Sequence, residues 1–340
     1  MYQISDAGME VGNDTHFHKT KKTRPMRQVQ VFRFGGPEVL EIRETEVPGI
    51  SKWELLVEVK YASANPKDVM LRKGKLKNYL SISFPLRLGQ DFAGIVKETG
   101  SKAGTFKPGD RVFGMVNETN NGTFSEYIRI SPNELCHAPS NLTLAEAAAV
   151  PLTAQTALRA LRNIGKVKPG QKVCINGAAG GVGVFAVQIA KILGAHVTAI
   201  SSEINHPLCR ELGADLTVDY RTLPPEKLPG RYDVFFDVFG NQSWRKTRHL
   251  LNPGGWYITT VPNFRNIADS FLSVFKIKNA RLVVVESDSE DLKLLKEWIE
   301  AGRLRPIVEA VFPLNEIAEV HRRIETKRTV GKIVVKVGRD

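Results

Sequence analysis

The chain has 340 residues, of which 42% are hydrophobic and 25% charged, as in a globular protein of about two domains. No run approaches the roughly 18 consecutive apolar residues that a membrane-spanning helix needs, so we expect no membrane span. The net charge of +12 is compatible with nucleic-acid binding. Because no long Lys/Arg block with interleaved aromatic residues occurs, we favour a basic surface that attracts a phosphorylated small molecule.

The N-terminal segment differs from the rest of the chain. Residues 1–25 are polar and patternless, and we expect them to form a disordered extension, with ordered structure from Met26. Its acidic residues argue against a transit peptide, and it has no apolar segment for a secretory signal. The three cysteines show no metal-ligand spacing and no disulfide framework, which is typical of a reducing compartment. We therefore expect a cytoplasmic protein, with organellar targeting left open.

The segment from Arg27 to Val150 has the pattern of a β-rich domain. Short runs with apolar and β-branched residues alternate with Gly and Pro turns, which favours a compact, barrel-like arrangement. The expected strands cover residues 28–34, 55–61, 91–98, 111–116 and 124–130. A helix follows Thr143, which forms a capping box with Glu146, and a second helix is expected over 153–161.

From Gln171 onward, predicted strands alternate with predicted helices. This alternation is typical of a parallel, doubly wound sheet, so the fold class is α/β. The strands are expected at 173–176, 196–200, 216–219, 232–238, 256–261 and 281–285, with helices ending at 193 and covering 207–212 and 242–251. A helix at 291–302, a strand at 307–312, a helix at 314–326 and a strand at 331–337 complete the chain.

A glycine-rich turn follows the first strand of this sheet. The strand at 173–176 leads into Gly177, Gly180, Gly181 and Gly183, and apolar residues at helical spacing come next. A strand, a glycine turn and a helix direct backbone N–H groups and a helix N-terminus toward a phosphate. Glycines also serve ordinary turns, so the neighbouring sequence has to support a dinucleotide site.

The end of the second strand bears on the choice of cofactor. An acidic residue there binds the ribose 2′-hydroxyl of NAD, and its absence leaves room for the 2′-phosphate of NADP. Here the strand ends in Ser201 and Ser202, which favours NADPH over NADH. Glu203 follows one or two residues later and keeps NADH open. His206 and Arg210 are nearby cations that could equally be solvated helix residues.

A set of motifs runs through the chain from about Val29 to Val337. They are Asn65-Pro-x-Asp68 with Arg72-x-Gly74, Leu88-Gly-x-Asp91-Phe-Ala-Gly94, Gly109-Asp-Arg-Val112, Phe124-Ser-Glu-Tyr127, Ala148-Ala-Val-Pro-Leu-Thr-Ala154, Gly177-Ala-Ala-Gly-Gly-Val-Gly183, Leu212-Gly-Ala-Asp215 with Asp219-Tyr220, and Gly331-Lys-Ile-Val334. With them the chain resembles the medium-chain dehydrogenase/reductase superfamily and, within it, the zinc-independent quinone oxidoreductase (zeta-crystallin-like) group.

The resemblance implies a GroES-like β-rich substrate domain, residues 26–152 and 287–340, that a Rossmann NADPH-binding domain, residues 153–286, interrupts. It also implies a homodimer. Zinc alcohol dehydrogenases of the superfamily carry a catalytic Cys and a Gly-His-Glu motif, whereas this chain has Ala62-Ser63-Ala64 and Gly89-Gln90-Asp91 in those regions. We therefore expect no metal. Without a Lewis acid, hydride transfer to a quinone or an α,β-unsaturated carbonyl is favoured over alcohol–ketone exchange.

The resemblance also assigns site residues. Glycines of the turn match the pyrophosphate loop, Ser201 and Ser202 the 2′-phosphate region, and Lys327 or Arg328 a C-terminal cation. The predicted cofactor-binding residues are Gly177, Ala179, Gly180, Gly181, Val182, Gly183, Ser201, Ser202, Tyr220, Phe239, Gly240, Lys327 and Arg328. The predicted catalytic residues are Asn65, Thr153 and Tyr79. Tyr220 could instead be an edge-strand aromatic, and Asn65 a turn residue before Pro66.

Two departures from the family pattern bear on the function. Asn205 stands where relatives often carry a lysine for the 2′-phosphate. Met70 and Leu76 stand where some quinone reductases carry tyrosines, with Tyr79 slightly later. The leading hypothesis is an NADPH-dependent reductase of quinones or enones. A non-catalytic NADPH-binding scaffold or RNA-binding crystallin-like protein and an enoyl-thioester reductase are the alternatives.

Overall fold

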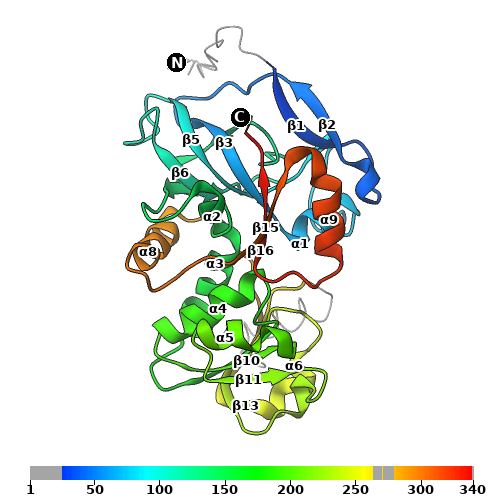
Figure 1. Ribbon diagram of the computed structural model, residues 1–340, viewed down its shortest axis with the longest axis vertical. Coiled ribbons are helices and arrows are strands. Elements are labelled where there is room, and N and C mark those ends of the chain that lie inside the picture. Colours follow the sequence, from blue (N-terminus) through cyan, green and yellow to red (C-terminus); the bar gives the residue numbers. More distant parts are fainter. Residues whose placement is uncertain (1–24, 263–269, 271–278, 339–340) are drawn as a thin grey trace, which may run out of the picture.

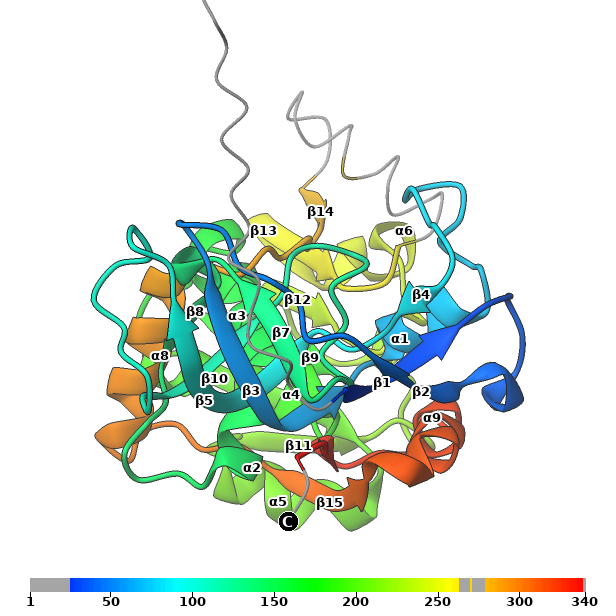
Figure 2. The same ribbon diagram turned by 90° about the horizontal axis from the view of Figure 1, so that it is seen from above.

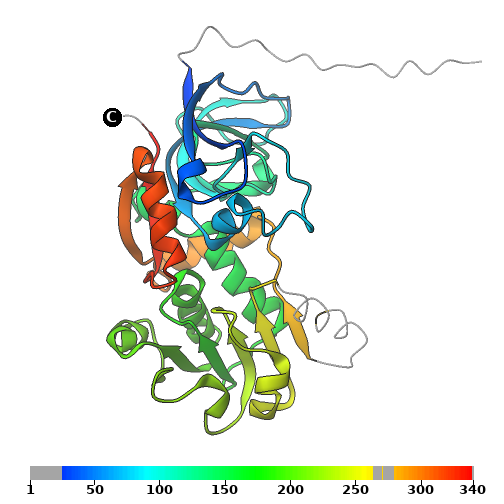
Figure 3. The same ribbon diagram turned by 90° about the vertical axis from the view of Figure 1, so that its right-hand side faces the viewer.

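The computed structural model describes residues 25–262, 270 and 279–338 and has two lobes (Figure 1). The expected disordered extension therefore lies, except for Pro25, outside the described residues. Figure 3 shows the lobes stacked, with α3 (Pro151–Leu158) and α4 (Gly181–Ile192) near their junction. Among the described residues, no helix combines the length and apolar character that crossing a bilayer requires.

The first lobe contains two β-sheets. The smaller has the order β2-β1-β4, and the larger β15-β16-β3-β5-β6-β8, with β7 also pairing with β3. The strands are β1 (Met26–Val31), β2 (Glu41–Thr45), β3 (Leu55–Ala64), β4 (Leu86–Arg87), β5 (Asp91–Thr99), β6 (Arg111–Met115), β7 (Tyr127–Ile130), β8 (Leu135–His137), β15 (Val308–Pro313) and β16 (Lys332–Lys336). Figure 2 shows β1, β2 and α9 (Ile317–Glu325) on the same side of this lobe.

The second lobe is built on a six-stranded parallel sheet. Its order is β11-β10-β9-β12-β13-β14, which is 3-2-1-4-5-6 within the lobe, the order of a dinucleotide-binding sheet. The strands are β9 (Lys172–Asn176), β10 (His196–Ser201), β11 (Leu216–Asp219), β12 (Tyr232–Asp237), β13 (Leu251–Thr259) and β14 (Ala280–Leu282). This confirms the predicted α/β fold with a doubly wound parallel sheet and a separate β-rich lobe.

Helices connect the strands and cover the sheets. They are α1 (Pro66–Arg72), α2 (Leu144–Ala148), α3, α4, α5 (His206–Glu211), α6 (Trp244–Thr247), α8 (Ser289–Glu300) and α9. Short 3-10 turns are η1 (Pro37–Val39), η2 (Pro132–Glu134), η4 (Glu203–Asn205), η5 (Pro225–Lys227), η6 (Arg248–Leu250) and η7 (Leu314–Glu316). The capping box at the start of α2 is confirmed, because the Thr143 hydroxyl accepts from Glu146 N–H while the Glu146 carboxylate accepts from Thr143 N–H.

Several expected boundaries are wrong, each for a local reason. The helix expected at 153–161 begins two residues earlier because proline is tolerated in a first helical turn, and from Arg159 to Ile164 it continues as a π-helix. The strand expected at 281–285 covers only β14. The Pro-Gly-Gly turn at 253–255 lies within β13, where a shift in the pairing with β12 accommodates the extra residues.

The last strand joins the two lobes at the glycine turn. Gly331 N–H donates to Ala179 C=O over 2.8 Å, and Gly180 and Gly331 form an isolated parallel bridge. β16 then pairs with β3 in the first lobe. Residues more than 150 positions apart therefore meet at one end of the parallel sheet.

Candidate cofactor and active site

The glycine turn lies at the carboxyl end of β9, the first strand of the parallel sheet. Gly177 has a positive φ of 88°, which a side chain would strain, and Gly180 is the N-cap of α4 without a side-chain cap. The first N–H groups of a helix have no intrahelical acceptor. The turn therefore exposes donors and the positive end of a helix dipole, a suitable arrangement for an anion.

The glycines of the turn differ in the space that a side chain would find at each position. A Cβ atom on Gly183 would lie 2.1 Å from Gly177 O, so glycine is required there for the helix to pack against the turn. A Cβ atom on Gly180 would find only that same oxygen within 4 Å, at 3.5 Å. One glycine thus allows close packing and another leaves an open approach, which fits the requirements of a dinucleotide pyrophosphate.

The other residues predicted in this loop lie close to the same junction. Ala179 is buried and holds Gly331 through its carbonyl, and Val182 is half-buried against the core of the parallel-sheet lobe. A Cβ atom on Gly181 would approach Lys332 Cδ to 3.1 Å and Thr153 Cγ2 to 3.5 Å. The turn is therefore bordered by the lysine that begins β16.

The residues predicted for the 2′-phosphate region lie together at the ends of β10 and β11. Ser201 is buried and its hydroxyl donates to Ser202 C=O over 3.2 Å. Tyr220 follows β11, is 50% exposed, and directs its N–H toward Ser201 C=O at 3.4 Å. Ser202 is half-buried, and its hydroxyl accepts from the Asn205 amide over 3.0 Å.

Residues predicted on two other segments reach the glycine turn or its neighbourhood. The Cβ position of Gly177 lies 3.2 Å from Phe239 Cβ, and Lys327 Nζ lies 5.6 Å from the Phe239 ring centroid. Gly240 has a φ of 78° and donates its N–H to Asp237 over 2.9 Å. Arg328 is exposed beside Lys327. Phe239 and Lys327 are thus brought to the turn, and Arg328 stays a prediction.

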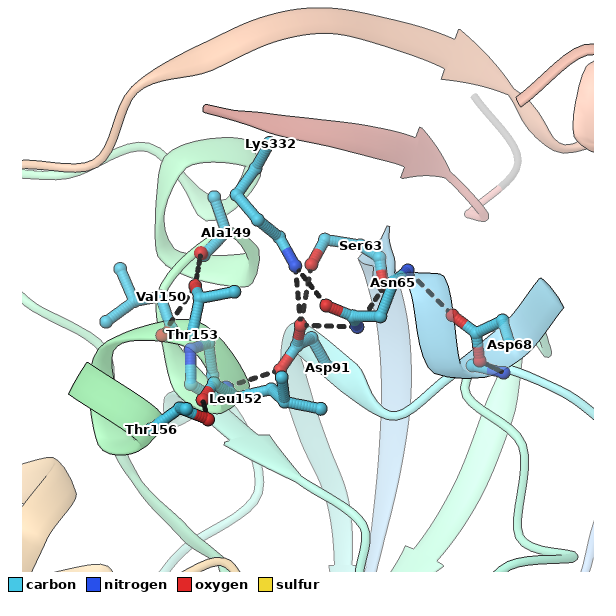
Figure 4. Close-up of polar contacts among 12 residues, drawn as sticks. Ser63, Asn65, Asp68, Asp91, Ala149, Val150, Leu152, Thr153, Thr156 and Lys332 are labelled. Carbon is cyan, nitrogen blue, oxygen red and sulfur yellow. Dashed lines mark hydrogen bonds and ion pairs between the residues drawn. The ribbon is translucent and has the colours of Figure 1, made fainter. Parts of the chain in front are cut away.

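A buried ion pair lies beside the glycine turn, inside the first lobe (Figure 4). Lys332 Nζ lies 3.1 Å from Asp91 Oδ2, and both side chains are almost fully buried. The same carboxylate oxygen accepts from the Ser63 hydroxyl over 2.8 Å, and Oδ1 accepts from Leu152 N–H over 2.7 Å. Asp91 therefore ties together β3, the first turn of α3 and β16.

Asn65 is part of this cluster. Its carboxamide donates to Asp91 Oδ2 over 2.9 Å and accepts from Lys332 Nζ over 2.5 Å, and the residue is 1% exposed. Asn65 also caps α1, with its N–H donating to the Asp68 carboxylate over 2.8 Å. Since both ends of the carboxamide are bonded to buried groups, its position is fixed by the ion pair.

Asp68 is the second buried carboxyl group at this end of the lobe. It accepts the N–H groups of Asn65 and Gly89 over 2.8 and 3.0 Å. Burial raises the pKa of Asp68 to about 6, although both hydrogen bonds favour the ionised form. The nearby charge of Asp91 acts in the same direction as burial.

The remaining predicted catalytic residues differ in their surroundings. Thr153 is buried on α3 and its hydroxyl donates to Ala149 C=O over 3.1 Å, so its methyl group is the part that lies near Gly181. Tyr79 is 59% exposed on the loop after α1. The structure therefore places Asn65 and Thr153 at the junction, whereas Tyr79 has no described contact with them.

Sequence reasoning assigned no role to Lys332, Asp91 or Asp68, although all three lie inside the quoted motifs. A usable signal existed in the C-terminal strand, because Lys332 precedes the apolar run Ile333-Val334-Val335 and is therefore a charge entering a buried strand. A lysine in such a place needs an acidic partner. Which carboxylate it meets could not be read from the sequence.

The fold and site can now be compared with known proteins. Residues 51–140 match the model of the alcohol dehydrogenase GroES-like domain, and residues 212–335 match that of zinc-binding dehydrogenases. The chain is 32% identical to the human mitochondrial NAD(P)H oxidoreductase RTN4IP1, over 90% of this chain and 88% of that protein. The chain belongs to the quinone oxidoreductase group of the medium-chain dehydrogenase/reductase superfamily. It is thus an oxidoreductase of this superfamily.

Two further comparisons agree with this family. The chain is 33% identical to the chloroplastic NADPH-dependent alkenal/one oxidoreductase of Arabidopsis thaliana, over 89% of this chain and 77% of that protein. The solved quinone oxidoreductase from Coxiella burnetii superposes with a TM-score of 0.84 at 31% identity, covering 93% of this chain and 100% of that one. Within the described part of this family member, no group of three or more His, Cys, Asp or Glu side chains is placed to hold a metal ion.

Proposed function

We propose that the chain is an NADPH-dependent, zinc-independent reductase that transfers a hydride to a quinone or an α,β-unsaturated carbonyl compound. The observation that carries the proposal is the glycine turn at the carboxyl end of β9. It has an open side at Gly180 and is bordered by Thr153 on α3 and by Lys332, which begins β16. The names of the relatives, which include quinone and alkenal/one oxidoreductases, support this acceptor class.

The cofactor would be held by three groups of residues. The turn would bind the pyrophosphate through backbone N–H groups, and hydroxyls and cations at the ends of β10 and β11 would bind the adenosine phosphate. Lys327 and Phe239 would close the site from the C-terminal and β12 sides. The full set is Gly177, Ala179, Gly180, Gly181, Val182, Gly183, Ser201, Ser202, Tyr220, Phe239, Gly240, Lys327 and Arg328.

In this mechanism the protein orients and shields rather than forming a covalent bond with the substrate. NADPH supplies the hydride when bound. The ion pair of Lys332 and Asp91 keeps the Asn65 carboxamide in one position at the junction of the lobes. Thr153 presents its methyl group beside Gly181 of the turn. We assign the proton transfer to the product to the exposed hydroxyl of Tyr79 or to a water molecule.

The residue types available support the proposal of zinc-independence. Gln90 stands in the region where zinc relatives carry a histidine ligand, and a carboxamide is a poor ligand for zinc. Prolonged treatment with 1,10-phenanthroline should therefore leave the reductase rate unchanged. A rate that falls with the chelator and recovers with added Zn²⁺ would refute this part of the proposal.

The main test is a titration of the purified chain with NADPH and NADH, followed by a substrate panel. We expect tighter binding of NADPH and its oxidation by quinones or 2-alkenals, with no turnover of simple alcohols. Oxidation only by 2-enoyl thioesters would favour an enoyl-thioester reductase. NADPH binding without turnover of any quinone or enone would favour a scaffold role.

We also propose a homodimer and a cytoplasmic location. β14 is an edge strand of the parallel sheet without a strand partner on its outer side among the described residues, and edge strands readily pair with another chain. Light scattering on the purified chain would show twice the monomer mass. Fusions of the full chain and of a chain lacking residues 1–25 to a fluorescent protein would test whether that segment directs import into an organelle.

A further inference from the structure

We propose that Arg221 binds the ribose 2′-phosphate of NADPH, and that Asp219 is the positioning residue that holds its guanidinium in place. The inference rests on the proposed function and adds the residue that selects between the two nicotinamide cofactors. Neither the glycine turn nor the hydroxyls of Ser201 and Ser202 supply a positive charge for that phosphate.

The pair lies where the second strand of the parallel sheet ends. Asp219 is the last residue of β11 and pairs directly with Ser201, the last residue of β10. Its carboxylate is almost buried and makes four contacts with Arg221. The backbone N–H donates to Oδ1 over 2.9 Å, Nε donates to both Oδ1 and Oδ2 over 3.1 Å, and Nη2 lies 2.9 Å from Oδ2.

This geometry uses only one edge of the guanidinium. Nε and Nη2 face the carboxylate, while Nη1 has no hydrogen-bond partner among the residues that the structure describes. The Arg221 side chain is 56% exposed. A guanidinium fixed along one edge retains donors along the other, and this fork matches the oxygens of a phosphate.

The ion pair also changes what the acidic residue can do. A free carboxylate beside the end of the second strand would favour NADH, because it binds the ribose 2′-hydroxyl and repels a 2′-phosphate. Here Arg221 engages both oxygens of Asp219 and holds the pKa of that carboxyl below its usual range. The pair is neutral overall and its exposed part is the cation, and the negative charge of the exposed Glu203 is close enough to contribute to the raised pKa of Arg221.

Two other basic groups near this edge, Arg210 and Lys327, are directed elsewhere, and His206 Nε2 is buried without a hydrogen-bond partner among the described residues. Arg210 donates to the Thr217 hydroxyl over 2.9 Å, two residues before the end of β11. Lys327 lies over the Phe239 ring beside the glycine turn. Asn205, where relatives often carry a phosphate-binding lysine, bonds to the Ser202 hydroxyl. Arg221 therefore supplies the charge that position 205 lacks.

The test measures binding of NADPH, NADH and 2′,5′-ADP by calorimetric titration of the full chain. Arg221→Ala should weaken NADPH and 2′,5′-ADP by roughly ten- to a hundred-fold, the effect expected for one charge-assisted contact. NADH binding should change by less than about threefold. Arg221→Lys should recover only part of the affinity, because one ammonium cannot hold both Asp219 and a phosphate.

Arg231→Ala is the matched control. It removes another exposed arginine, which directly precedes β12 at the amino ends of the parallel strands, whereas Asp219 lies at their carboxyl ends. Binding of both cofactors should stay unaffected. Asp219→Asn should weaken the binding of NADPH but not that of NADH, because the Arg221 guanidinium is no longer held in place by a carboxylate. Thermal unfolding of the free Arg221 and Arg231 variants should match that of the original chain, since both arginine side chains are exposed.

The possible outcomes separate the inference from the proposed function. If the original chain binds NADPH and Arg221→Ala retains that affinity, the role of Arg221 is wrong and the reductase proposal stands. Equal losses of affinity for NADPH and NADH would also overturn the proposed role of Arg221, because they would mean that Arg221 contacts a group that both cofactors share. If Asp219→Asn weakens NADH instead, the acid itself binds the ribose. Binding of neither cofactor by the original chain would overturn both proposals.

Discussion

At the scale of single residues, the glycines after β9 have separate physical tasks. Gly177 adopts a left-handed backbone conformation, Gly183 allows the helix to touch the turn, and Gly180 has an extended φ of −79° that any residue can adopt. A side chain at each position would therefore have a different effect. Stability and cofactor binding can be separated by substituting them one at a time.

Gly183→Ala should destabilise the fold. Its Cβ atom would lie 2.1 Å from Gly177 O and 2.6 Å from Ala178 C, and backbone atoms cannot yield as a flexible side chain does. We expect a loss of at least about 3 kcal/mol in the free energy of unfolding, the upper range for overpacking. Urea unfolding followed by circular dichroism measures this loss. A variant as stable as the original chain would show that α4 does not pack on the turn as described.

Gly180→Ala should behave in the opposite way. The added methyl group meets only Gly177 O at 3.5 Å, and the backbone conformation suits alanine, so stability should stay within about 1 kcal/mol of the original. The methyl group would occupy the open side through which a pyrophosphate approaches the backbone, and NADPH should bind roughly tenfold more weakly or worse. Unchanged affinity in a calorimetric titration would argue against a pyrophosphate at this turn.

At the scale of elements, α9 carries a buried histidine, His321. Neither ring nitrogen of His321 has a hydrogen-bond partner among the residues that the structure describes, and the ring lies beside that of Phe124. Burial, together with the charge of Arg72, lowers the pKa of His321 to about 3, while Glu325 partly opposes this. Arg72 is itself fully buried and paired with Glu325 on the same helix. The helix therefore packs with a neutral imidazole next to a buried cation.

This arrangement predicts a pH dependence of stability. The folded-state pKa of about 3 lies below the ordinary value of 6.5, so the unfolded chain takes up the proton first as the pH falls. The stabilisation of the folded state that comes from the neutral His321 is complete above pH 6.5. It is lost as the pH falls toward 3, at up to about 1.4 kcal/mol per pH unit. His321→Leu should remove this pH dependence of the free energy of unfolding, and at pH 5 the variant should unfold at a higher urea concentration than the original chain. Parallel stability curves for the two chains between pH 4 and 7 would contradict the prediction.

An element can be predicted from the sequence when the interactions that form it are between residues close together in the chain. The alternation of β9, α4 and β10 follows from the local spacing of apolar residues and from Gly194, which ends the helix, and these elements were predicted. The start of α2 was also predicted, because its capping box is formed by residues close in sequence. The π-helix over 159–164 was not, because its hydrogen bonds skip one more residue than those of an α-helix and leave no distinct apolar spacing. The short strands β2, β4 and β8 depend on pairing with distant strands, so local sequence carries little sign of them.

The same distinction applies to the site. The glycine turn and the strand-end serines are adjacent in sequence and were predicted together, whereas Lys332 and Asn65 are 267 positions apart and meet only through the fold. The motifs contained Asp91 and Lys332, yet only the structure shows that they form an ion pair. The contact between Asp219 and Arg221 is local in sequence, but its bearing on cofactor choice depends on β11 lying beside β10.

At the scale of the whole molecule, Asp91 joins segments that belong to different parts of the fold. Its carboxylate binds Ser63 and Asn65 in the β-rich lobe, Leu152 at the start of the helix that leads to the parallel sheet, and Lys332 on the returning strand. One apolar cluster lies within the β-rich lobe, and another extends from the parallel-sheet lobe to Ala93, Phe113 and Cys136 of the β-rich lobe. The carboxylate is thus a polar connection between the lobes that adds to the apolar core they share.

Removing one member of the buried pair should therefore weaken the link between the lobes. Lys332→Met leaves the Asp91 carboxylate buried without its cation, and breaking such a pair costs about 3–5 kcal/mol. The double variant Lys332→Met with Asp91→Asn removes both charges and should recover a measurable part of that loss. Lys246→Met, on the exposed surface of α6, is the control and should change the unfolding free energy by less than about 0.5 kcal/mol.

Calorimetry and hydrogen exchange would show where the loss acts. If the pair couples the lobes, Lys332→Met should separate one unfolding transition into two, with exchange rising first in β3, α3 and β16, the elements that Asp91 connects. A single transition shifted as a whole, with no local rise in exchange, would mean that the pair stabilises the molecule without linking its lobes. The two results differ because a lost link lowers cooperativity, whereas a lost contact lowers only the total free energy of unfolding.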